Sequence, residues 1–114
     1  MTSILIVGLG SVGKRHLRAC RDLGAVVVAV DPWANFDNIW DAGFEGARNL
    51  REVSHRSFDY CVISNWGPDH ISTLEEVFSR ELTNRFIIEK PLSGSFQELE
   101  WLEKLATAGQ ISFV

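Results

Sequence analysis

Basic residues are scarce in this chain, with 11 Lys and Arg against 15 Asp and Glu, which gives a net charge of −4 over 114 residues. That balance disfavours a nucleic-acid-binding surface, which needs a basic stripe. Long hydrophobic runs are missing too, since the apolar run 25–30 has the length of a strand and cannot span a membrane. The N-terminus shows neither a basic segment nor a cleavage site, so no secretory signal is expected.

Cysteine is also rare: Cys20 and Cys61 are the two in the chain, and their spacing fits no metal motif. Without a secretory signal, we expect both to be reduced, packed thiols in a cytoplasmic protein. His16 and His55 stand apart, so no metal site is expected. The chain does have 46% hydrophobic and 23% charged residues, which is typical of a soluble globular protein, and its length suits a single domain.

Short apolar runs alternate with amphipathic stretches, a pattern typical of βα units and a parallel sheet. Strands are predicted over residues 3–7, 26–30, 46–47, 60–64, 86–89 and 111–114. Helices are predicted over 11–23, from Pro68 onward and behind the capping box of Ser95 and Glu98, with weaker pieces over 35–42 and 50–55. The first helix should bury Leu17, Cys20 and Leu23. The predicted fold class is α/β, a single domain with a Rossmann-type, doubly wound, six-stranded parallel sheet.

A glycine-rich turn follows the first predicted strand, in the run Gly8-Leu9-Gly10-Ser11-Val12-Gly13. The first glycine makes a tight turn, the second lets the backbone approach a pyrophosphate, and the third lets helix and strand pack closely. Backbone N–H groups and the positive end of the helix dipole then point at one spot, which suits a phosphate. The same run resembles a P-loop, but Arg15 stands where that motif needs Ser or Thr, so an NTPase is not expected.

Asp31 ends the second predicted strand. Its carboxylate can accept both hydroxyls of an adenosine ribose and repels a 2′-phosphate, and residues 32–34 supply no cation to hold one. Strand, glycine turn, helix, strand and acid in this order predict a bound dinucleotide, NAD in preference to NADP. The alternative is that Asp31 only starts a turn ahead of Pro32.

A second motif, Ile87-Ile88-Glu89-Lys90-Pro91-Leu92, is a hydrophobic strand that runs into Glu-Lys-Pro. With the glycine turn, and with segment 59–64 followed by a loop ending in His70, it resembles the N-terminal half of the glucose–fructose oxidoreductase, inositol dehydrogenase and rhizopine-catabolism (Gfo/Idh/MocA) family. The resemblance covers essentially all of residues 1–114 and implies an NAD(P)-binding domain. The family's second α/β domain, which supplies most of the substrate pocket, has no counterpart in this sequence.

The resemblance implies that Lys90 is the catalytic residue, beside the nicotinamide, where a cation stabilises alkoxide character as hydride leaves. Taken alone, a Lys before a Pro is usually a solvated surface charge. The resemblance also implies that Glu89 hydrogen-bonds the nicotinamide ribose and that Pro91 follows a cis peptide. Ser11 and Val12, within the glycine turn, are expected to contact the cofactor.

The loop after the fourth predicted strand departs from the family. Members often carry Thr-Pro-Asn where this chain has Asn65-Trp66-Gly67. Asn65 and Trp66 are still expected to line the cofactor groove, with Trp66 stacking on an adenine or nicotinamide ring. His70 either contacts the cofactor or simply begins the helix behind Pro68.

These features predict the cofactor-binding domain of an NAD-dependent oxidoreductase that moves hydride between nicotinamide and a hydroxyl of a sugar, cyclitol or sugar derivative. The family's second domain would hold that substrate, so this chain alone should turn over little. Two alternatives stay open, a stand-alone NAD(H)-binding sensor and a methyltransferase-like nucleoside binder. Four tryptophans could face an absent domain or pair two copies of the chain, which makes a homo-oligomer a further hypothesis: Trp33, Trp40, Trp66 and Trp101.

Overall fold

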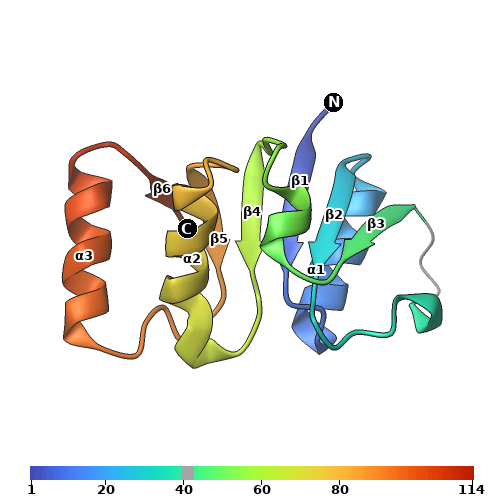
Figure 1. The fold of residues 1–114 in the computed structure, drawn as a ribbon, viewed down its shortest axis with the longest axis horizontal. Coiled ribbons are helices and arrows are strands. Elements are labelled where there is room, and N and C mark those ends of the chain that lie inside the picture. The colour runs from blue at the N-terminus through green and yellow to red at the C-terminus, as the bar shows by residue number, and fades with distance from the viewer. Residues whose placement is uncertain (40–42) are drawn as a thin grey trace.

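Six parallel strands form one sheet in the computed structural model of the protein, which describes residues 1–39 and 43–114 (Figure 1). Their order across the sheet is β3-β2-β1-β4-β5-β6. The chain therefore adds β2 and β3 on one side of β1, crosses back, and adds the last three strands on the other side. The bounds are β1 (Ser3–Val7), β2 (Val26–Val30), β3 (Phe44–Ala47), β4 (Tyr60–Ile63), β5 (Arg85–Ile88) and β6 (Ser112–Phe113).

Helices cover both faces of the sheet (Figure 1). The helix α1 (Ser11–Asp22) packs behind the sheet in the view of Figure 1, while α2 (His70–Ser79) lies in front and α3 (Phe96–Thr107) beside β6. Three short 3₁₀ turns complete the chain: η1 (Phe36–Asn38), η2 (Leu50–Val53) and η3 (Gly67–Asp69). No helix in the described part of the chain is long and apolar enough to cross a membrane.

The central strands are buried on both faces because helices lie over each. Leu5 faces the α2 side, where it joins a cluster with Leu74 and Leu102. Ile6, the next residue, faces the α1 side and clusters with Leu17. A strand buried on both sides needs a continuous apolar sequence rather than an alternating one. The runs of β1 and β2 have that composition, which confirms the predicted doubly wound α/β fold.

Two weaker helix predictions are wrong in type. The segment predicted as a helix over 35–42 forms the 3₁₀ turn η1, and residues 40–42, which include Trp40, lie outside the described residues. The segment 50–55 forms the 3₁₀ turn η2. Leu23 is 87% exposed instead of buried, because α1 ends at Asp22 and the chain turns away at Gly24 (φ 84°).

All strands point the same way, so their carboxyl ends meet at one edge, the lower edge in Figure 1. The glycine turn, Asp31 and Glu89 each follow directly, or within one residue, the end of a strand at this edge. The switch in strand order also falls here, between β1 and β4, where open α/β sheets bind ligands. This edge is therefore the first place to look for a site.

Candidate functional site

The fold requires glycine at two positions of the glycine turn and has space for a side chain at the third. Gly8 has a φ of 100°, and a Cβ there would lie 2.5 Å from the backbone of Asn65. Gly13 packs against the first glycine, since a Cβ on it would lie 2.8 Å from the carbonyl carbon of Gly8. At Gly10, a Cβ would meet nothing within 4 Å. The turn thus leaves a cradle at Gly10 that a side chain would fill, which fits the close approach of a phosphate group.

The N-terminus of α1, all of which the structure describes, is open to an anion. Gly10 is its N-cap and supplies no side-chain hydrogen bond, and the first turn holds no acidic residue. Ser11 and Val12 are exposed there. The first N–H groups of a helix lack partners within the helix and carry the positive end of its dipole. This end of α1 can therefore take a phosphate.

Asp31 ties the glycine turn to the loop after β2. Its Oδ2 accepts a hydrogen bond from the N–H of Leu9 at 2.8 Å, and its Oδ1 accepts from the N–H groups of Trp33 (2.7 Å) and Ala34 (2.9 Å). The turn-forming role considered for Asp31 is thus present. A carboxylate has about four acceptor positions, so these three bonds leave room for a ribose hydroxyl.

Arg48 is a residue of this edge that the sequence analysis missed. It follows β3, and its Nη1 donates to the carbonyl oxygens of Asp31 (3.2 Å) and Ala34, while its guanidinium lies 4.6 Å from the ring centre of Phe36. Residues 32–34 carry no cation themselves, but the neighbouring strand brings one to Asp31. The signal was the register: Val30 pairs with the residue just before Arg48, which places it beside Asp31.

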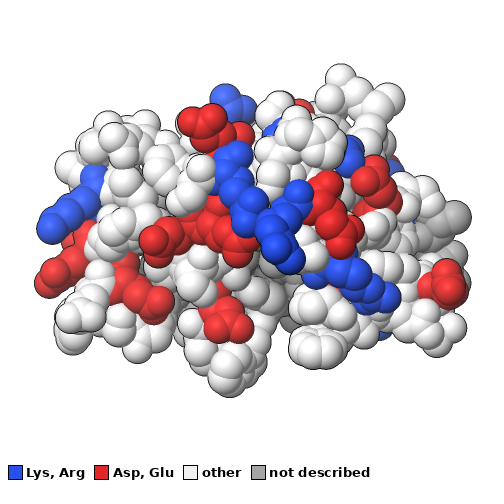
Figure 2. All heavy atoms as spheres, in the orientation of Figure 1, with Lys and Arg blue, Asp and Glu red and all other residues white. Residues whose placement is uncertain are grey.

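A cavity of about 280 Å³ lies between the glycine turn, the loop after β2 and the loop after β4. It brings together five of the predicted site residues: Gly8, Gly10, Asp31, Asn65 and Trp66. Trp33 and Trp66 line it with side chains that are 90% and 73% exposed. Figure 2 shows charges of both signs mixed over the face that carries α2, whereas the lower rim is mostly uncharged. Exposed indole rings beside the open turn at Gly10 suit a ligand with flat, aromatic rings.

Asn65 has one satisfied and one unsatisfied amide atom. Its Nδ2 donates to Thr73 Oγ1 at 2.8 Å, and its Oδ1 is the buried side-chain atom without a hydrogen-bond partner in the described part of the chain. Such an orphan acceptor is uncommon and often marks a place where a ligand or water binds. The atom belongs to a residue that lines the cavity.

His70 lies behind the cavity wall and is 1% exposed. Its Nδ1 is 2.7 Å from the carbonyl oxygen of Pro91, and its Nε2 is 2.9 Å from that of Asn65. The ring therefore joins the loop after β4 to the Glu-Lys-Pro segment. The structure assigns His70 to a contact with the protein backbone, and any contact with a cofactor stays a prediction.

The Glu-Lys-Pro segment follows β5 at the same edge. The Lys90–Pro91 peptide is cis, as the family resemblance implies. Lys90 is exposed, and Pro91 packs on Gly67, where a Cβ would lie 3.0 Å from the proline Cδ. Glu89 Oε1 lies 2.7 Å from His16 Nε2 on α1. Pro91 thus packs against the loop whose Asn65 and Trp66 line the cavity, while residues 89–91 do not line it themselves.

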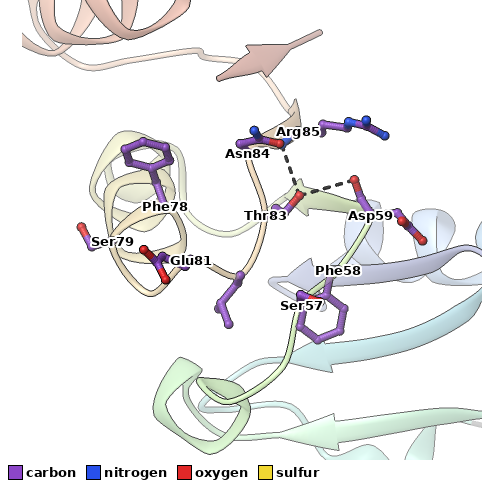
Figure 3. Close-up of a pocket in the computed structure, with 10 residues that line it drawn as sticks. Ser57, Phe58, Asp59, Phe78, Ser79, Glu81, Thr83, Asn84 and Arg85 are labelled. Carbon is purple, nitrogen blue, oxygen red and sulfur yellow. Dashed lines mark hydrogen bonds between the residues drawn. The ribbon is translucent and has the colours of Figure 1, made fainter. Parts of the chain in front are cut away.

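A larger hollow, about 690 Å³, lies at the opposite edge, between the end of α2 and the loop before β5 (Figure 3). Thr83, which lines it, has partners within the chain: its Oγ1 donates to the carbonyl of Asp59 and accepts from the N–H of Arg85. The N–H of Ser3 donates to the carboxylate of Asp59 at 2.8 Å, which lowers the pKa of that residue. We favour the smaller cavity as the site, because Asn65 Oδ1 has no hydrogen-bond partner among the described residues there and the turn at Gly10 is open.

The two cysteines are poor candidates for chemistry. Cys61 is fully buried in β4, and Cys20 is half-buried on α1. Burial raises the pKa of both thiols, which disfavours the reactive thiolate. No group of three or more His, Cys, Asp or Glu among the described residues could hold a metal ion.

Comparison with family models and with curated protein sequences finds no match. Comparison with solved structures finds WlbA and inositol dehydrogenases among its matches. The WlbA (WbpB) dehydrogenase from Thermus thermophilus, in complex with NAD and UDP-GlcNAcA, has a TM-score of 0.76 and 24% identity, over 100% of this chain and 41% of that chain. The scyllo-inositol dehydrogenase from Lactobacillus casei, with bound NAD(H) and scyllo-inositol, has a TM-score of 0.82 and 21% identity, over 100% and 35%.

The myo-inositol 2-dehydrogenase from Lactobacillus plantarum gives a similar result, with a TM-score of 0.78 and 22% identity over 98% of this chain and 35% of that chain. The chain thus spans about a third to two fifths of the length of these structures. At such identities the likeness shows the fold. The resemblance to inositol dehydrogenases, predicted from the glycine turn and Glu-Lys-Pro, is therefore confirmed at that level: the chain has the fold of one part of these dehydrogenases.

Proposed function

We propose that the chain is the NAD-binding domain of an oxidoreductase that acts on a hydroxyl of a sugar, cyclitol or sugar derivative. One observation carries the proposal: the open cradle at Gly10, the uncapped start of α1 and the carboxylate of Asp31 surround one cavity. A dinucleotide carries a pyrophosphate, ribose diols and flat rings, and each has a matching group there. The dehydrogenases of similar fold, with NAD and either UDP-GlcNAcA or scyllo-inositol in their structures, support the proposed substrate class.

In this proposal the chain's own residues bind and orient the dinucleotide. The N–H groups of Ser11 and Val12 hold the pyrophosphate, while Gly10 leaves space for it. Asp31 accepts the adenosine ribose hydroxyls and disfavours a 2′-phosphate through charge repulsion. Trp33 and Trp66 cover flat rings at the cavity mouth.

Lys90 is the proposed catalytic residue. Nicotinamide, when bound, supplies the hydride acceptor. The ammonium group of Lys90, exposed at the same edge, would hold the substrate hydroxyl and stabilise negative charge on its oxygen as the C–H bond breaks. An ammonium has no lone pair to accept the proton of that hydroxyl, so the proton would pass to water at this exposed edge. In the parent enzyme, a second domain would hold the substrate against Lys90.

A titration of the chain with NADH and with NADPH tests the proposal. Trp33 and Trp66 line the cavity, so a bound reduced nicotinamide should quench indole fluorescence and receive energy from it. We expect saturable binding of both, with NADH tighter because of Asp31. Tighter NADPH would contradict the role of Asp31. Binding of S-adenosylmethionine without NADH would favour the methyltransferase-like alternative, and no binding of any of the three would reject the groove as a nucleotide site.

A further inference from the structure

Three residues in a row, Glu89, Lys90 and Pro91, are held at both ends by histidines. On one side, His16 Nε2 lies 2.7 Å from Glu89 Oε1. On the other, His70 Nδ1 lies 2.7 Å from the carbonyl oxygen of Pro91. Lys90 stands between the two contacts, with an exposed side chain. The position of Lys90 therefore depends on two rings that belong to different helices.

The contact of His16 with Glu89 crosses the molecule from α1 to the end of β5, and 73 residues separate the two. The N–H of Glu89 donates to the carbonyl of Ile63 at 3.0 Å, so the backbone of Glu89 stays on the sheet while its side chain reaches α1. Their side chains are 27% and 36% exposed. A partly buried, charge-assisted hydrogen bond of this kind holds geometry better than an exposed ion pair.

His70 makes the second contact, with Pro91. Its ring is buried, and its two nitrogens face the carbonyls of Pro91 and Asn65. The contact with His70 fixes the position of Pro91, but it does not fix Glu89 and Lys90, which precede it. Glu89 is therefore the point at which the start of the segment is fixed to α1, the helix that begins at the glycine turn.

We infer that His16 is a positioning residue: through Glu89, it sets the place of Lys90 relative to the glycine turn. The inference rests on the proposed function for the role of Lys90. It also assigns Glu89 a partner within the protein, where the family resemblance implied a contact with the nicotinamide ribose. His16 does not line the cavity, so its effect on the site passes through its contact with Glu89.

The test uses three single variants of the full chain, His16→Ala, His16→Gln and Glu89→Gln, with the double variant His16→Ala/Glu89→Gln. His55→Ala is the matched control, because His55 is exposed and lies elsewhere. One readout needs no cofactor: the backbone amide resonance of Lys90 in ¹⁵N-labelled protein. The other is the dissociation constant of NADH.

We expect His16→Ala to shift the Lys90 amide resonance and to weaken NADH binding about fivefold, as the loss of one hydrogen bond to a charged group allows. His16→Gln keeps a donor for Glu89 and should recover most of the affinity, while His55→Ala should change neither readout. The double variant should lose no more than His16→Ala does, because both changes act on the same contact: one removes the imidazole and the other the charge of the carboxylate.

Additive losses in the double variant would overturn the inference, because Glu89 would then act on the cofactor independently of His16. An unmoved Lys90 resonance in His16→Ala would overturn it as well. If the resonance moves but the unaltered chain binds no NADH, the positioning of Lys90 by His16 stands and the proposed function fails.

Discussion

Replacing Gly10 by Ala should separate cofactor binding from folding. The backbone of Gly10 has φ −73° and ψ −164°, a conformation that Ala adopts freely, and the new methyl group would meet nothing within 4 Å. Two small effects then oppose each other. Ala restricts the unfolded chain, which stabilises the fold by about 0.4–1 kcal/mol, but Ala is a poorer N-cap than Gly by roughly a similar amount. We expect the free energy of unfolding to change by less than about 0.5 kcal/mol.

NADH binding should respond very differently to Gly10→Ala. The methyl group would occupy the open space over the turn, where the proposed pyrophosphate has to approach the N–H groups of Ser11 and Val12. Longer and weaker hydrogen bonds at that point should raise the dissociation constant at least about tenfold, which corresponds to about 1.4 kcal/mol. The two measurements are urea unfolding and NADH titration, both followed by tryptophan fluorescence.

Gly13→Ala is the matched control, the same chemical change three residues later. There the new Cβ would overlap the carbonyl group of Gly8, so α1 must move away from β1. Overpacking of this kind costs about 1–3 kcal/mol, so this variant should be clearly less stable. If Gly10→Ala bound NADH as tightly as the unaltered chain does, the pyrophosphate of NADH would not lie close to Gly10. The proposed pyrophosphate position would then be refuted. A loss of stability equal to that of Gly13→Ala would refute the reasoning from the open turn at Gly10.

Arg48→Met removes the cation beside Asp31 and should weaken NADPH binding more than NADH binding. Equal losses for both would show that Arg48 only holds the loop after β2. Asp59 gives a pH dependence: the N–H of Ser3 lowers its pKa, so the carboxylate stabilises the fold above its ordinary pKa and this contribution is lost as the pH falls through the lowered value. The stability difference between the unaltered chain and Asp59→Asn, measured by urea unfolding, should therefore shrink from about pH 7 to about pH 2. A difference that stays constant would contradict this role.

The sheet could be predicted because its signals are local and strong. The bounds of β1 and β2 agree with the sequence prediction, since five apolar residues in a row between turn residues leave few other structures open. The segment after Asp31 lacks such a signal. There Asn35 accepts a hydrogen bond from the N–H of Asp37, which starts a 3₁₀ turn, and Phe36 packs its ring on Gly46 of the neighbouring strand. A contact with a distant glycine, rather than helical periodicity, decides that conformation.

The residues of the candidate site likewise differ in whether the sequence could predict them. The glycine turn and Asp31 could be read from the sequence because the strand, the turn and the helix dictate their places. Arg48 required the register of β2 and β3, which no local pattern contains. The contact between His16 and Glu89 joins residues 73 positions apart, and His16 carries no motif of its own that pointed to it. Polar contacts between distant elements depend on the final packing, so they follow from the structure alone.

These distant contacts also fix the shape of the groove. Asp31 joins the glycine turn to the loop after β2, and His70 joins the loop after β4 to the Glu-Lys-Pro segment. Because these hydrogen bonds already hold the loops in place, a ligand would not have to order them. A preformed site of this kind binds more tightly for the same contacts. Under the proposed function, turnover would have a further requirement, because an alcohol would have to be held against Lys90 in a reactive geometry. If the proposal holds, dinucleotide binding and hydride transfer should therefore separate in this chain: a titration should show NADH bound in the groove, while an assay of NAD reduction by polyols should show little turnover.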